Sequence, residues 1–156
     1  MVKKYFNKFV YYDKLTGDYS EQHPADALPL NRFIKFDSKL EFAVYEILKR
    51  YIPVPRIILQ VPIELKPKTL YSDKINYLVD FCVTDDRNNV DFFVEAKGLM
   101  LPGAKLKLKL LEILCPAIRS KLMIVSERKT CYFGKKYAPS ETLTELKRFL
   151  GNKYGQ

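Results

Sequence analysis

The spacing of apolar residues in the first half of the chain predicts one helix followed by a bent strand. In the segment 37–51, apolar residues recur every three or four positions, and Ser38 stands where a helix N-cap is expected. Pro53 marks the end of this helix, because proline cannot continue the helical hydrogen-bond ladder. The next segment, 56–65, is rich in β-branched residues and interrupted by proline, which is typical of an edge or bent strand.

The second half of the chain predicts a hairpin and three further elements. The apolar runs 75–83 and 90–98 flank the polar sequence TDDRNN, a pattern that indicates an antiparallel hairpin. Lysine and leucine alternate in 103–114, but the length and the shared apolar face favour a helix. A buried strand is predicted at 121–126 and a closing amphipathic helix at 140–151. The order helix, three strands, helix, strand, helix predicts an α/β domain with a mixed central sheet flanked by helices.

The N-terminal part of the chain shows neither the helical nor the strand periodicity of apolar residues. Glycine, proline and aspartate are frequent between residues 13 and 29, which predicts an irregular arm. We therefore divide the chain into an N-terminal arm, 1–35, and a main domain, 36–156. The length of 156 residues and the hydrophobic content of 47% suffice for one compact core.

Three charged residues of the predicted hairpin fall on one face of it. If Arg87 and Asn88 form a two-residue turn, Asp80 faces Glu95 directly; if the turn slips by one residue, Asp80 faces Lys97 and Glu95 lies diagonally. Two carboxylates so placed among apolar neighbours repel each other, and a divalent ion such as magnesium or manganese would offset the repulsion. An ordinary ladder of exposed charges is the alternative interpretation.

A third acid, Glu41, falls on the apolar side of the first predicted helix, near Leu48 and Ile52. This position predicts a carboxylate that faces the sheet. The alternative is a capping box, in which Glu41 reaches back to the helix start at Ser38.

In this arrangement the chain resembles the PD-(D/E)xK nuclease superfamily, in which a helix-borne acid precedes an Asp and then a Glu-x-Lys on adjacent strands. The matches are Glu41 in FDSKLEFAVYEIL, Asp80 in INYLVDFCV, and Glu95 with Lys97 in FFVEAKG. The resemblance covers about residues 36–126 and is greatest to small phage-type nucleases, including junction resolvases and transposase endonuclease subunits. No proline precedes Asp80, a position that is commonly apolar in the family.

The resemblance implies a restriction-endonuclease-like core, a magnesium ion that manganese can replace, and hydrolysis of DNA. Asp80, Glu95 and the carbonyl of Ala96 would hold the ion, with Glu41 completing its shell or assisting a second ion. Lys97 would orient or deprotonate the attacking water. Gln60 is a candidate neighbour of the site, although a strand glutamine is more often a surface residue.

The charge of the chain also favours DNA as the partner. Lysine and arginine number 27 against 18 acidic residues, and the formal charge of +9 attracts polyanions such as nucleic acid. Basic residues on predicted helices and loops are candidates for phosphate contacts, but a solvated helix face would have the same pattern. The candidates are Lys105, Lys107, Lys109, Arg119 and Lys121, with Lys35, Lys39, Lys49 and Arg50 earlier in the chain.

The expected substrate is branched or junction DNA, by analogy with the proteins that the chain resembles. A junction cutter must nick two strands, so we expect a homodimer, with the arm 1–35 as the dimerisation element. One alternative is a nuclease subunit that needs a transposition or recombination partner. Another is a basic DNA-binding module without catalysis.

The cysteines, the single histidine and the lengths of the apolar runs exclude several classes of protein. The three cysteines, Cys82, Cys115 and Cys131, are widely spaced among apolar neighbours and are predicted to be reduced packing residues. The single histidine, His23, excludes nuclease and zinc chemistries that need several histidines. The chain has neither a secretory signal nor an apolar run of about 18 residues, so we expect a cytoplasmic protein without a membrane segment.

Overall fold

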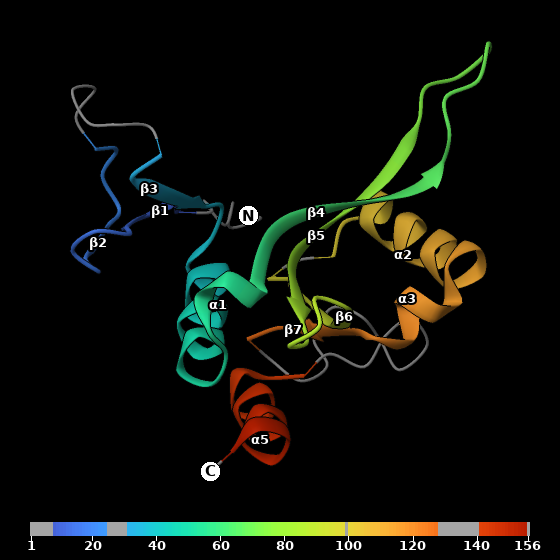
Figure 1. The fold of residues 1–156 in the computed structure, drawn as a ribbon. Coiled ribbons are helices and arrows are strands. Elements are labelled where there is room, and N and C mark those ends of the chain that lie inside the picture. The colour runs from blue at the N-terminus through green and yellow to red at the C-terminus, as the bar shows by residue number, and fades with distance from the viewer. Residues whose placement is uncertain (1–7, 25–30, 99, 128–140, 156) are drawn as a thin grey trace.

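The computed structural model describes residues 8–24, 31–98, 100–127 and 141–155. The central feature is a four-stranded mixed sheet in the order β4-β5-β6-β7, accompanied by a three-stranded antiparallel sheet in the order β2-β1-β3 (Figure 1). The elements are β1 (Val10–Asp13), β2 (Tyr19–Ser20), β3 (Phe33–Phe36), α1 (Lys39–Tyr51), the 3₁₀ turn η1 (Val54–Arg56), β4 (Ile57–Lys66), β5 (Ile75–Thr84), β6 (Val90–Ala96), α2 (Pro102–Leu114), α3 (Pro116–Ser120), β7 (Leu122–Val125) and α5 (Leu143–Tyr154).

Helices flank the central sheet, which confirms the predicted α/β class with a mixed sheet. Strands β4, β5 and β6 are antiparallel neighbours, whereas β7 pairs with β6 in parallel. One apolar cluster joins the sheet to α1 and α5, with Leu48 and Leu146 fully buried. A second cluster joins the sheet to α2 through Leu108 and Leu111. Alternating strand residues therefore supply two separate cores, one on each face.

The β5–β6 hairpin has the first of the two predicted registers. Phe81 faces Val94 and Val83 faces Phe92, which continues to Asp80 opposite Glu95. The predicted two-residue turn at Arg87 and Asn88 is wrong. A three-residue loop, 86–88, forms instead, with Asn88 at φ 62, and a bulge beside Val83 restores the register. Asparagine tolerates this left-handed backbone conformation. The three-residue loop and the bulge together give the same strand register as the predicted two-residue turn.

The irregular arm that the sequence predicts between residues 13 and 29 is wrong in part, because β1, β2 and β3 form a sheet. The polar residues after β1 make a tight turn: Asp13 Oδ1 accepts from Leu15 N at 2.8 Å, and Gly17 has φ 79. Arg32 donates to both oxygens of Asp13 and ties the turn to the start of β3. The turns of this short sheet are rich in the same polar residues and glycine as an irregular segment, and for this reason the composition predicted an irregular arm.

The structure also bears on the cysteines and on the length of the helices. Cys82 is buried and Cys115 is partly buried, and both are free thiols, as predicted; Cys131 lies outside the described residues. None of the described helices is long and apolar enough to cross a membrane.

Candidate active site

The site begins where the β4–β5 strand pair bends. Val79 belongs to the core under α2, whereas Phe81, two residues later, belongs to the core under α1. Residues two apart share a face in a regular strand, so the pair turns between them, at Asp80. The facing residue of β4, Gln60, has φ 53, a left-handed conformation that bends the strand. This confirms the predicted bent edge strand.

Asp80 and Glu95 interlock across β5 and β6. Asp80 Oδ2 accepts from the backbone N–H of Ala96 at 2.8 Å, and Glu95 Oε2 accepts from the N–H of Asp80 at 3.2 Å. Both side chains are buried, Glu95 with an exposed fraction of only 1%. The alternative interpretation, an ordinary ladder of exposed charges, is therefore wrong, because these carboxylates are inside the protein.

Lys97 follows Glu95 on the same face and forms an ion pair with its carboxylate. Its backbone N–H donates to Val125 O at 2.8 Å, so the position after β6 is fixed to β7. Burial alone would lower the pKa of Lys97, but the neighbouring carboxylates, led by Glu95, raise it above the usual value. A lysine so held is a cation, suited to orienting water or phosphate more than to removing a proton.

Glu41 enters the same cluster from α1. Its exposed fraction is 8%, which confirms the prediction that it faces inward. Only half of a capping box is present: Ser38 Oγ accepts from Glu41 N at 3.1 Å, but the Glu41 carboxylate accepts from Asp37 N at 3.0 Å. Burial, and next the charge of Asp80, raise the pKa of Glu41 to about 7.

The cluster has more negative than positive charge. Burial raises the pKa of Asp80, and the bond from Ala96 and the charge of Lys97 offset this only in part. Burial also raises the pKa of Glu95, with the charge of Asp80 next in size. Three acids and one lysine therefore lie together in a poorly hydrated part of the protein. An additional cation would be bound favourably there, because it would offset the excess negative charge.

The types of ligand atom at this site suit a hard divalent cation, although their arrangement does not form a finished site. Within the part of the chain that the structure describes, no group of three or more Asp, Glu, His or Cys side chains is placed so that it could hold a metal ion. Asp80 and Glu95, the backbone carbonyl of Ala96 and water oxygens are nevertheless the ligand types that magnesium and manganese take, usually with several waters retained.

Two residues near the cluster add to the predicted set. Gln60 Nε2 donates weakly to Asp80 Oδ1 at 3.4 Å, so this candidate does lie beside the site. Tyr77 was not predicted: it is buried, and burial, followed by the charges of Glu95 and Asp80, raises its pKa. Its position in β5, inside an apolar run, resembles ordinary core packing and gave no sign of this proximity.

The predicted DNA-binding residues fall into two places. Lys105, Lys107 and Lys109 lie on α2, which begins five residues after Lys97. Arg119 and Lys121 lie at the opposite end of β6 and β7 from Glu95.

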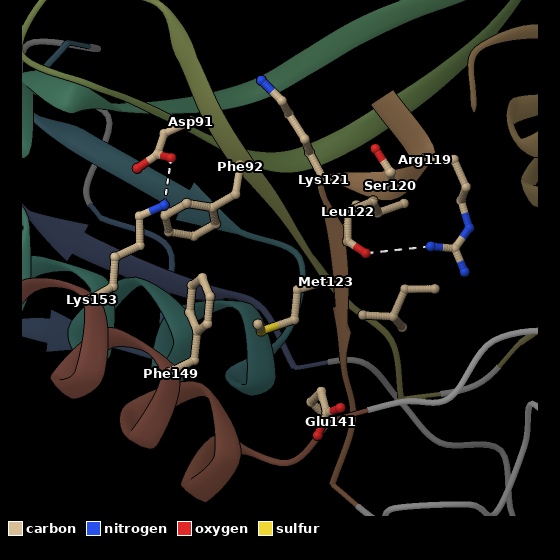
Figure 2. Close-up of a pocket in the computed structure, with 11 residues that line it drawn as sticks. Asp91, Phe92, Arg119, Ser120, Lys121, Leu122, Met123, Glu141, Phe149 and Lys153 are labelled. Atoms are coloured by element: carbon tan, nitrogen blue, oxygen red, sulfur yellow. Dashed lines mark hydrogen bonds and ion pairs between the residues drawn. The ribbon is translucent and has the colours of Figure 1, made fainter. Parts of the chain in front are cut away.

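Figure 2 shows this second region, a pocket lined by Arg119, Lys121 and Lys153 among other residues. Arg119 donates to Leu122 O at 3.4 Å and Lys121 to Val90 O at 2.8 Å. The structure therefore separates these two cations from the acidic cluster.

The earlier basic candidates lie on α1 or before it, and most have acidic partners. Lys35 pairs with Asp37 at 3.6 Å, and Lys39 pairs with Glu21. Lys49 pairs with Glu46 and donates to Tyr12 Oη at 3.0 Å, whereas Arg50 is exposed at the end of α1. Contact with a phosphate backbone would require the paired cations to leave these acids.

No protein-family model matches the chain, and neither the curated proteins nor the solved structures include a match. The argument for function consequently rests on the residues of the site.

Proposed function

We propose that this protein is a divalent-metal-dependent endonuclease that hydrolyses DNA phosphodiester bonds on a restriction-endonuclease-like core. The observation that carries the proposal is that Glu41, Asp80 and Glu95 are buried together at the bend of the sheet, with the half-buried Lys97 paired to Glu95 beside them. These residues come from α1, β5 and the end of β6. Their types and their order are those of the PD-(D/E)xK arrangement that the sequence resembles.

In the proposed reaction, Asp80, Glu95 and the carbonyl of Ala96 hold a magnesium ion, which manganese can replace. When bound, the ion polarises the phosphate and acidifies a water molecule. Glu41 completes the ligand shell directly or through water. Lys97 stays protonated beside Glu95 and orients the attacking water or the phosphate.

DNA with a branch or four-way junction is the proposed substrate. The formal charge of +9 favours a polyanion, and α2, which carries Lys105, Lys107 and Lys109, begins five residues after Lys97. Two strands of a junction must be cut, so we propose a homodimer that uses residues 1–35, of which the structure describes β1, β2 and β3 in part. Cleavage takes place in the cytoplasm in this proposal.

The experiment is cleavage of labelled four-way-junction, duplex and single-stranded DNA with magnesium, manganese or EDTA. Wild type is compared with Asp80→Asn and Lys97→Ala, and with Glu112→Gln and Lys147→Ala as controls that remove exposed charges from α2 and α5, outside residues 1–35. Metal-dependent cutting that both site variants lose and both controls keep would support the enzyme. Unfolding midpoints of all five proteins separate lost chemistry from lost folding.

Two other outcomes would replace the proposal. If no DNA is cut until a recombination or transposition protein is added, the chain is a nuclease subunit. If nothing is cut under any condition and all five proteins bind DNA equally, the acidic cluster has no part in catalysis and the chain is a basic binding module.

A further inference from the structure

The arm formed by β4 and β5 ends in a turn with two large apolar residues at its centre. Thr69 N donates to Ser72 O at 2.9 Å, and the two hydroxyls lie 3.1 Å apart, which closes a four-residue turn. Leu70 and Tyr71 occupy the central positions, where glycine, proline, asparagine or aspartate are usual. Their exposed fractions, 89% and 92%, are the highest of the large hydrophobic residues that the structure describes.

The root of the arm, unlike its tip, is part of the core. Ile63, Leu65, Tyr77 and Val79 pack with α2 in the second apolar cluster. Beyond these residues the two strands extend away from the rest of the described chain (Figure 1). Folding therefore fixes the direction of the arm but gives Leu70 and Tyr71 nothing to pack against.

Lysines surround the tip. Lys68 and Lys74 are exposed, and Lys66 donates to Ser72 Oγ at the base of the turn. Lys68 has one acidic neighbour, Asp73, at 3.6 Å between fully hydrated side chains, a pair that contributes little. Cations beside an exposed aromatic ring suit a nucleic acid, whose phosphates attract lysine and whose bases stack on tyrosine.

The arm also has a suitable length. Tyr71 is nine residues from Asp80, and β5 covers this stretch from Ile75 on, so the tip lies at most roughly 30 Å from Asp80. Duplex DNA rises about 3.4 Å per base pair, so the tip would reach at most about nine base pairs from a phosphate held at the acidic cluster. A two-stranded ribbon is narrow enough to enter a groove.

We propose that the tip of this arm is a second DNA contact, which enters a groove and wedges Leu70 and Tyr71 against the bases. The inference rests on the proposed function for the identity of the nucleic acid and for the distance from the cut. Apolar wedges of this kind part neighbouring base pairs and kink the duplex. A second copy of this chain is a poorer occupant, because two side chains bury only a few hundred Å², well below a stable interface.

The test uses DNA binding without cleavage. A labelled duplex about three helical turns long is titrated in EDTA, and its anisotropy reports affinity for wild type, Tyr71→Ser and Tyr71→Phe. Val54→Ser is the matched control, because Val54 is also an exposed large hydrophobic residue in a turn and lies outside residues 1–35. A second duplex carries 2-aminopurine, whose fluorescence rises when its base is unstacked.

We expect Tyr71→Ser to bind about tenfold more weakly and to lose the fluorescence rise, because stacking on one aromatic ring has an effect of this size. Tyr71→Phe and Val54→Ser should behave as wild type. Equal affinity for wild type and Tyr71→Ser would overturn the proposal, as would a dimer that only Tyr71→Ser dissociates. Cleavage is measured separately with magnesium. If the protein cuts no DNA but its DNA affinity still depends on Tyr71, the proposed nuclease activity is wrong and the proposed DNA contact at the tip of the arm is supported.

Discussion

Replacing Glu41 with glutamine should stabilise the protein at neutral pH. Burial and the charge of Asp80 raise the pKa of Glu41 from 4.5 to about 7, so the folded protein binds this proton more tightly than the unfolded chain does. Ionisation of Glu41 then opposes folding. The penalty is absent below pH 4.5, grows as the pH rises to about 7, and is constant above that.

The size of the effect follows from the same pKa. At about 1.4 kcal/mol per pH unit, the difference corresponds to about 3 kcal/mol. An exposed fraction of 8% leaves some solvent screening, so we expect about 2 kcal/mol. For a domain of this length that is a rise of about 4–8 °C in the unfolding midpoint. Glutamine keeps an oxygen that can accept from Asp37 N, so the helix start is preserved.

The assay is thermal or urea unfolding in EDTA, followed by circular dichroism between pH 4.5 and about 8. The curves for wild type and Glu41→Gln should coincide at the acid end and separate as the pH rises. Glu112→Gln, which changes an exposed acid of α2, should follow wild type throughout. Equal or lower stability of Glu41→Gln at about pH 8 would refute the reasoning and leave the carboxylate as a helix cap alone.

Three further predictions concern the metal, the core and the N-terminal turn. Magnesium at about ten times its dissociation constant should raise the midpoint of wild type by about 3–6 °C and leave that of Asp80→Asn unchanged, measured by thermal unfolding with and without EDTA. Leu48→Ala should lower the free energy of unfolding by about 3 kcal/mol in urea titrations, because Leu48 is fully buried between α1 and the sheet. The bond from Arg32 lowers the pKa of Asp13 to about 2, so its stabilising contribution is present above the unfolded value of 3.8 and lost as the pH falls towards 2. Asp13→Asn should therefore reduce the acid sensitivity of stability in that range, whereas unchanged acid sensitivity would contradict the ion pair's role.

The four residues of the cluster, Glu41, Asp80, Glu95 and Lys97, could be predicted because three lie in regular elements and Lys97 directly follows β6. Strand alternation puts Asp80 and Glu95 on one face, and helical periodicity turns Glu41 inward, whatever happens in the loops. One of the two predicted registers is present in spite of a wrong turn. Both registers keep the apolar side chains of the hairpin on the same faces, whereas a shift that changed faces would have exposed them. The buried face therefore limits the possible registers, and the loop adapts to the one that forms.

Features that depend on single backbone conformations could not be predicted. Nothing in the sequence marks Gln60 for φ 53, because glutamine has no preference for the left-handed region. The sheet of β1, β2 and β3 has only two to four residues per strand, too few for an alternation to be recognised.

The acidic cluster is not what stability alone would produce. Buried ionic groups can usually be replaced by apolar residues of similar volume without loss, and often with a gain, because burial removes their hydration. Here two acids, Asp80 and Glu95, lie across from each other with a single lysine; burial raises the pKa of each, and the charge of Asp80 further raises that of Glu95. The apolar clusters on both faces of the sheet supply the stability that this arrangement opposes. A site that destabilises its own fold in this way is best explained by a ligand of opposite charge, and the Glu41→Gln and magnesium experiments measure the two halves of that argument independently.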